Sequence, residues 1–133
     1  MSRIESRVHA LWPLLSVRDL ERSMDFYTRT LGFEVAGKAE SSTGVFWCRI
    51  RRGGACLMLQ QQDPPAAPTP AAAPGVGFYF VCQDVDEIFA EFCGKGLILD
   101  PPSEAYYGMR QLFVPDPDGY SVIFESPTES WAG

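Results

Sequence analysis

The sequence predicts an α+β fold made of two βαβββ modules that share one core. Two observations carry this prediction: the order strand, helix, three strands occurs twice, and a segment rich in proline and alanine separates the two occurrences. A chain of 133 residues has room for one compact domain or two small half-domains. We therefore expect a single domain over 1–133, with modules over 8–62 and 76–127 and a semi-extended connector over 63–75.

The first module starts with the apolar stretch LWPLLSV, after which apolar residues recur at helical spacing. Asp19 stands before them as a good N-cap, and Gly32 follows them as a helix end. The pair Gly53-Gly54 favours a two-residue hairpin turn between the last two strands. The helical stripe is Leu20, Met24, Tyr27 and Leu31, and the strands are expected over 11–17, 33–39, 44–52 and 55–61.

The second module repeats this order. Asp84 caps its helix, with Glu87 three residues on as in a capping box. The sequence DPDG predicts a type I turn before the last strand, with Pro117 in the second place and Gly119 in the fourth. The strands are expected over 75–82, 97–103, 109–115 and 120–126.

A shift of the chain by 65 positions places Asp19 on Asp84 and Tyr27 on Phe92, so cap and apolar stripe coincide. Because the strand order matches as well, this agreement favours an ancient duplication. The alternative is coincidence between two amphipathic helices.

Composition limits the partners and the compartment. The net charge of −6 disfavours nucleic acid and anionic lipid, and no segment reaches the ~20 apolar residues that cross a bilayer. Four cysteines in apolar stretches, with no C-x-x-C pair, are typical of reduced, buried thiols in a cytoplasmic protein. They are Cys48, Cys56, Cys82 and Cys93.

Three segments carry a resemblance to a known family: VRDLERSMDFYTRTLGFEV, QDVDEIFAEFCGKGL and YGMRQLFVPDPDGYSVIFE. From about Leu11 to Ser126 the chain resembles the vicinal oxygen chelate superfamily of glyoxalases, extradiol dioxygenases, fosfomycin-resistance enzymes and bleomycin-resistance proteins. The resemblance implies two half-barrels that enclose a cleft, in which the catalytic members hold a divalent metal.

The positions that correspond to the metal ligands of such enzymes carry no suitable side chain here. Imidazole and carboxylate groups would have to converge on one point. The four positions are Trp12, Met58, Gly77 and Ile123. We therefore expect no cofactor and place the chain nearest the metal-free bleomycin-resistance branch. The single histidine, His9, is interpreted as a surface residue, and a register slip that brings it to a metal is the alternative.

Alternation along the strands predicts an apolar, aromatic cleft that suits a planar or amphipathic organic ligand. Acidic surroundings, with Glu125 at the rim, favour a ligand that carries positive charge. Trp47 is expected on the opposite face of its strand, against the helices or an interface. The candidate ligand-binding residues are Trp12, Phe46, Cys48, Met58, Tyr79, Tyr106, Tyr107, Met109, Arg110, Ile123 and Glu125.

Several of these residues have a structural alternative. Trp12 is either a stacking platform or part of the core. Tyr106 and Tyr107 form a lid, or one closes the core and the other covers a dimer contact. Arg110 hydrogen-bonds a ligand or pairs with an aspartate.

The first functional hypothesis is a metal-free protein that binds and sequesters an aromatic or cationic organic compound, in the manner of antibiotic-resistance proteins, as a cytoplasmic homodimer. A metal-dependent lyase, isomerase or dioxygenase is the alternative, with ligands such as His9, Glu104 or Glu125. Metal-free acid–base catalysis by Glu125, Tyr106 or Arg110 is a third possibility, and a regulatory role with a vestigial cleft is a fourth.

Overall fold

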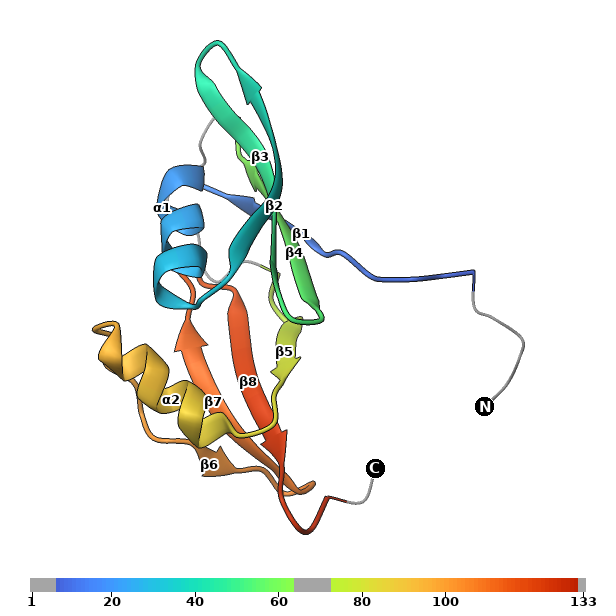
Figure 1. The fold of residues 1–133 in the computed structure, drawn as a ribbon, viewed down its shortest axis with the longest axis vertical. Helices are drawn as coiled ribbons and strands as arrows, with labels where there is room; N and C mark the ends of the chain where they lie inside the picture. Colours follow the sequence, from blue (N-terminus) through green and yellow to red (C-terminus); the bar gives the residue numbers. More distant parts are fainter. Residues whose placement is uncertain (1–6, 64–72, 132–133) are drawn as a thin grey trace.

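The computed structural model describes residues 7–63 and 73–131, and these form two modules with the same element order (Figure 1). The first module contains β1 (Leu14–Val17), α1 (Leu20–Asp25), β2 (Glu34–Ser41), β3 (Gly44–Arg52) and β4 (Ala55–Gln61). The second contains β5 (Gly77–Val81), α2 (Val85–Gly94), β6 (Ser103–Glu104), β7 (Met109–Pro115) and β8 (Ser121–Pro127). Most of the expected connector lies outside the described residues.

Each module forms one four-stranded mixed sheet. The strand order is β1-β4-β3-β2 in the first sheet and β5-β8-β7-β6 in the second, so corresponding strands occupy corresponding places. β1 pairs with β4 in parallel, and β5 pairs with β8 in parallel, while the other neighbours are antiparallel. The predicted α+β class and its two glyoxalase-type modules are confirmed.

Both helices begin where the sequence predicts. The Asp19 carboxylate accepts a 3.1 Å hydrogen bond from the backbone N–H of Arg22, and the Asp84 carboxylate accepts one of 3.0 Å from Asp86. These bonds satisfy backbone donors that the first helical turn leaves free. After α1 the chain continues as a π-helical turn over Phe26–Thr30.

The strand expected over 97–103 is wrong. Only Ser103 and Glu104 pair, in β6, with Gln111 and Arg110 of β7. Pro101 and Pro102 lack the backbone N–H that a ladder requires, so the apolar run before them forms no strand.

The core lies between the helices and one face of each sheet. Figure 1 shows α1 and α2 on the same side of the two sheets. The core face of each strand follows period two, as in the pairs Cys48–Leu59, Ile50–Leu57 and Leu112–Phe124, all of them buried. We call the opposite faces the open faces, because no helix within the described residues covers them. The first sheet's open face comprises Trp12, Leu14, Ser16, Trp47, Arg49, Arg51, Cys56, Met58 and Gln60; the second sheet's comprises Gly77, Tyr79, Val81, Gln111, Phe113, Ser121, Ile123 and Glu125.

The two modules contact each other reciprocally through turns and helices. The DPDG turn between β7 and β8 reaches the first module, where Tyr27 donates a 2.6 Å hydrogen bond to Asp116 and Arg18 forms a 2.9 Å ion pair with Asp118. In return, Arg52 at the end of β3 forms a two-point ion pair with Glu91 of α2, with both N···O distances 2.8 Å. Each hairpin turn therefore docks on the other module's helical segment.

No helix in the described part of the chain is long and apolar enough to cross a membrane.

Candidate ligand-binding site

The open face of the second sheet contains a hollow with a largely apolar lining. Register places Gly77 beside Ser121, and Tyr79 and Phe113 on either side of Ile123. The hollow has a volume of about 550 Å³. We call it the sheet hollow; its lining residues are Gly75, Val76, Gly77, Tyr79, Phe113, Val114, Pro115, Ser121, Val122 and Ile123.

Tyr79 leans over Gly77 within this hollow. A Cβ atom built on Gly77 would lie 2.7 Å from Cε1 of Tyr79 and 3.6 Å from Cδ1 of Ile123. The absence of a side chain at Gly77 thus makes room for the tyrosine ring. Tyr79 is still about half exposed, at 52%, so one part of its ring remains free to contact a ligand.

A buried carboxylate lies further along the same face. Glu125 is only 6% exposed, and its Oε1 accepts hydrogen bonds from the Tyr107 hydroxyl (3.0 Å) and from Nε2 of Gln111 (2.9 Å). Nε2 of Gln111 also donates to the Tyr107 oxygen at 2.6 Å. Both donors are neutral, and among the described residues Glu125 forms no ion pair. Desolvation, and next the hydrogen bond to Glu125, raises the pKa of Tyr107, which keeps the phenol protonated as a donor.

An aromatic group adjoins this carboxylate. Tyr106 is fully exposed and packs edge-on against Tyr107 at 5.3 Å between ring centres, and Tyr107 packs likewise against Trp131 at 6.1 Å. The Thr128 hydroxyl donates a 2.8 Å hydrogen bond to the Gly108 carbonyl, which holds the C-terminal segment here. Tyr107 is therefore fixed while Tyr106 projects into solvent, and their role as a lid stays a prediction.

The first sheet's open face presents Trp12, Met58 and Arg49. The guanidinium carbon of Arg49 lies 4.2 Å from the centre of the Trp12 ring, and Nη1 donates to the Cys56 sulfur at 3.4 Å. Among the described residues Arg49 forms no ion pair. Trp12 is 46% exposed, so it is not a core residue, and Arg49 already covers one of its faces.

The expected cleft-facing side of two strands is wrong. Cys48 is fully buried in the core, whereas Trp47 and Arg49 lie on the open face. Alternation separates two faces but does not say which one a helix covers. Here the apolar Cys48 and Ile50 pack inward, and Arg49 and Arg51 lie on the opposite face. Phe46 lines a different hollow, beside Asp19 and Leu20 at the start of α1.

The same error affects β7. Arg110 points to the helix side, where it forms a two-point ion pair with Asp86 of α2 at 3.0 Å, so its structural alternative is the one observed. Met109 is 3% exposed and offers little surface to a ligand. Gln111 and Phe113 occupy the open face instead, and sequence reasoning missed both. A usable signal was present, because Leu112 and Val114 form the more apolar of the two alternating sets.

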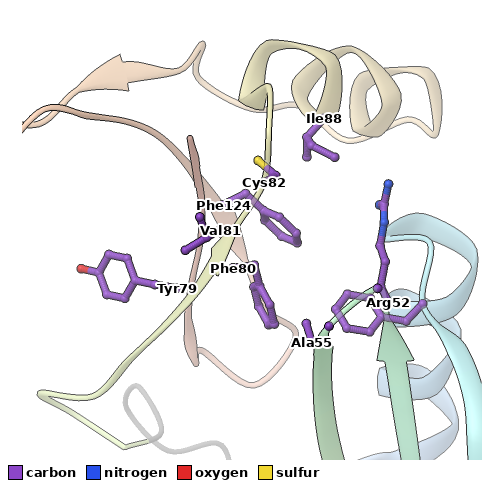
Figure 2. A pocket seen from close by; sticks show the side chains of 11 residues that line it. Arg52, Ala55, Tyr79, Phe80, Val81, Cys82, Ile88 and Phe124 are labelled. Carbon is purple, nitrogen blue, oxygen red and sulfur yellow. The ribbon is translucent and has the colours of Figure 1, made fainter. Parts of the chain in front are cut away.

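A second hollow, also about 550 Å³, lies at the seam between the modules. Figure 2 shows Ala55 and Arg52 of the first module facing Phe80 and Ile88 of the second, with Tyr79 directed away from them. The two-point ion pair with Glu91 fixes the Arg52 guanidinium. No local sequence pattern predicts this seam hollow, since it depends on how the modules dock.

A divalent metal does not fit the corresponding positions. Trp12, Met58, Gly77 and Ile123 offer no imidazole or carboxylate group, and Tyr79 fills the space above Gly77. Within residues 7–63 and 73–131, no three His, Cys, Asp or Glu side chains are grouped as a metal site requires. His9 is exposed near the start of the described chain, and Glu104 is exposed on β6.

Comparisons with known proteins agree with this architecture. The chain is 28% identical to a lactoylglutathione lyase of Pseudomonas putida, over 86% of the chain and 83% of that protein. It is 22% identical to a catechol-2,3-dioxygenase of Bacillus subtilis, over 98% of the chain but only 46% of that protein's length. Among solved structures, TnmS3, an antibiotic binding protein from Streptomyces sp. CB03234, matches with a TM-score of 0.65 and 25% identity, over 92% of this chain and all of that one.

A family model describes nearly the whole chain, from residue 8 to residue 124. This match spans the first module and the second as far as Phe124 in β8. The chain therefore belongs to the Glyoxalase/Bleomycin resistance protein/Dioxygenase superfamily.

Proposed function

We propose that this protein binds and sequesters an aromatic organic compound in the sheet hollow, without a metal ion and as a homodimer. The observation that carries the proposal is the lining of the hollow, in which Tyr79, Phe113 and Ile123 converge around a position without a side chain, Gly77. Such a lining binds a ligand by burying its aromatic surface and requires no chemical reaction. Of the two expected ligand characters, aromatic and cationic, the hollow supports the aromatic one best.

Similarity to TnmS3 supports the binding role, because that protein is described as an antibiotic binding protein and its whole length aligns with this chain. The four non-ligating positions support the metal-free part of the proposal. The four cysteines are free thiols, but only Cys48 is buried, and the expectation that Cys93 is buried is wrong. The cytoplasmic location stays a prediction.

Two matched substitutions test the site. Phe113→Ala and Tyr79→Ala each remove an aromatic ring from the hollow and should weaken binding by about 1–3 kcal/mol, or roughly 5- to 150-fold. Phe46→Ala is the control, because Phe46 is also about half exposed but lies on the other side of its sheet. Titration with acridine, a flat three-ring aromatic compound, followed by protein fluorescence, gives the dissociation constants.

A native mass spectrum of protein purified without chelator supplies the second measurement. We expect metal-free dimers, with any retained compound visible as added mass. Stoichiometric zinc, nickel, iron or manganese would instead favour the alternative function, a metal-dependent lyase, isomerase or dioxygenase. If Phe113→Ala and Tyr79→Ala bound acridine as tightly as the control Phe46→Ala, the sheet hollow would not be the binding site.

A further inference from the structure

The seam hollow has the composition of a small-molecule site, and it lies on the other side of the sheets from the sheet hollow. Its volume of about 550 Å³ falls within the ~300–1,000 Å³ that is usual for ligand pockets. Apolar side chains from both modules line it, and these belong to the hydrophobic core or pack against it, so the seam hollow faces away from the open faces. They are Phe33, Ala55, Phe80, Ile88 and Phe124.

Three phenylalanine rings give this hollow a contiguous aromatic surface. Phe80 packs edge-on against Phe33, with 5.6 Å between the ring centres, and is stacked with Phe124 at 4.9 Å. Phe33 and Phe124 are only 4% and 3% exposed, so core packing fixes their rings. Phe80 is less deeply buried and faces Ala55 across the hollow (Figure 2). A flat aromatic compound can pack against such a surface by offset or edge-on contact.

The guanidinium group of Arg52 supplies a fixed polar group in this lining. Its Nη1 donates hydrogen bonds of 2.8 Å to the Leu31 carbonyl and to Glu91, and its Nη2 donates one of 2.8 Å to the other Glu91 oxygen. Gly32 makes room for it, because a Cβ atom there would lie 2.8 Å from Nη1. A guanidinium has five N–H groups, of which these contacts use three. The two that remain, on Nε and Nη2, are neighbours and have no acceptor in the described chain.

The charges around Arg52 favour a neutral acceptor for these two N–H groups. Glu91 already balances the guanidinium charge, and the whole chain carries a net charge of −6. A second carboxylate on Arg52 would lie close to Glu91, and the two like charges would repel each other. A carbonyl oxygen carries no net charge and has two lone pairs, so it can accept both N–H groups.

We propose that the seam hollow binds a flat, neutral aromatic compound that carries a carbonyl oxygen, with its rings against Phe80 and its oxygen on Nε and Nη2 of Arg52. The hairpin turn at Gly53 and Gly54 leaves the rim of the hollow open, because a Cβ atom at either glycine would meet nothing within 4 Å.

This second site does not depend on the proposed function. Phe113 and Ile123 line the sheet hollow but not the seam hollow. Tyr79 borders both, and Figure 2 shows its ring directed away from the seam hollow. A ligand can therefore occupy either hollow without contact with the aromatic side chains that carry the other.

Two probes that differ at a single position test the contact with Arg52. Fluorene has a methylene group where 9-fluorenone has a carbonyl group, and equilibrium dialysis gives both dissociation constants. We expect 9-fluorenone to bind about two- to tenfold more tightly, as one hydrogen-bonded group allows. Arg52→Met should abolish this preference, whereas Glu91→Gln should keep it, because the guanidinium remains. 9-Fluorenone-2-carboxylate should bind the wild-type protein more weakly than 9-fluorenone does, because of its charge.

Filling the hollow tests where the probe lies. Ala55→Leu adds bulk opposite Phe80 and should weaken 9-fluorenone binding about tenfold or more by loss of aromatic contact. Ala39→Leu is the matched control, because Ala39 is also half-buried on a strand of the first sheet but does not line the hollow. Circular dichroism confirms that each variant is folded.

Cys82 gives a second readout that needs no substitution. Its thiol lines the seam hollow, whereas Cys93 is exposed on α2 and does not. Bound 9-fluorenone should slow the alkylation of Cys82 by iodoacetamide and leave that of Cys93 unchanged. Peptide mass spectrometry measures both rates in one sample.

An unchanged rate of Cys82 labelling would overturn the inference, as would equal 9-fluorenone affinity in Ala55→Leu and Ala39→Leu. A preference for 9-fluorenone over fluorene that survives in Arg52→Met, or tighter binding of the carboxylate probe, would refute the proposed contact and ligand class.

Phe113→Ala separates this inference from the proposed function. If this variant lost 9-fluorenone binding while Ala55→Leu kept it, the probe would occupy the sheet hollow and the inference would be wrong. If Phe113→Ala left acridine binding unchanged while 9-fluorenone still protected Cys82, the proposed function would fail and the inference would stand.

Discussion

Tyr27 and Asp116 join the two modules through a 2.6 Å hydrogen bond between buried groups. The tyrosine comes from the helical segment of the first module and the aspartate from the DPDG turn of the second. The other carboxylate oxygen of Asp116 accepts backbone hydrogen bonds from Asp118 (2.7 Å) and Tyr120 (3.3 Å). One side chain thus closes the turn and anchors it to the neighbouring module.

Removal of the Tyr27 hydroxyl group should destabilise the protein. Tyr27→Phe leaves the Asp116 carboxylate buried and removes the hydrogen-bond donor of its Oδ2 atom. We expect a loss of about 1–3 kcal/mol in the free energy of unfolding. Urea denaturation followed by circular dichroism measures it. Tyr106→Phe serves as the control, because Tyr106 is fully exposed and the loss of its hydroxyl group should change the stability little. An unchanged urea midpoint for Tyr27→Phe would show that this hydrogen bond contributes nothing.

The same carboxylate predicts a pH dependence. Burial raises the pKa of Asp116 above its usual 3.8, although the hydrogen bonds from Tyr27 and the turn act in the opposite direction. The folded protein therefore binds this proton more tightly than the unfolded chain does. The resulting stabilisation is complete below pH 3.8 and is lost as the pH rises through the raised value. Relative to Asp116→Asn, wild-type stability should accordingly decline across this range.

Denaturation of both proteins at a series of pH values isolates the contribution of this one carboxyl group. Asp100→Asn, a change at an exposed aspartate, gives the background. A wild-type protein that gains stability over Asp116→Asn with rising pH would mean that the hydrogen bonds outweigh burial.

The two-point ion pair of Arg52 with Glu91 should contribute modestly to the docking of the modules. Arg52→Lys keeps the charge but loses the planar fork, so we expect a loss of about 0.5–1 kcal/mol in the free energy of unfolding. Arg51→Lys is a matched control, since Arg51 pairs with Glu34 on the neighbouring strand and both side chains are more than half exposed. Raising the salt concentration from about 0.1 M to 1 M should reduce the loss caused by Arg52→Lys, because it shortens the Debye length from ~10 to ~3 Å. Equal losses in both variants would mean that the seam gains nothing from this pair.

Cys48 should resist alkylation in the folded protein. Burial raises its pKa to about 11, so little thiolate is present near neutral pH, and the side chain is fully covered. Iodoacetamide at pH 8 should label the exposed Cys93 first and reach Cys48 only after unfolding. Peptide mass spectrometry reads out both sites in one experiment. Early labelling of Cys48 would place it at an accessible surface, in keeping with its predicted position in the cleft.

The sequence predicted the elements better than their faces. Caps at Asp19 and Asp84, and the turn ending at Gly119, are local and follow from residue type, so they could be predicted. The direction of Cys48 and Arg110 depends on which side of the sheet a helix covers, and that is a tertiary property. The apolar run before Pro101 shows the opposite case: the two prolines, a local feature of the sequence, prevent the strand that hydrophobicity alone predicts.

The candidate site was predicted where a strand contributes a clear pattern. Tyr79, Ile123 and Glu125 lie on the open face as expected, because alternation along β5 and β8 was assigned in the correct sense. Their binding roles stay predictions. Gln111 was missed because its importance depends on two side chains, Tyr107 and Glu125, from other segments.

The reciprocal docking of turns on helical segments ties the stability of the halves together. If one module unfolded alone, its own core would be exposed. The buried Tyr27–Asp116 hydrogen bond and the Arg52–Glu91 ion pair between the modules would also be lost. Partial opening is for that reason costly, and melting should proceed as one cooperative event in which fluorescence and circular dichroism trace the same curve. The two modules repeat one element order, yet this docking leads us to expect that they do not unfold as separate units.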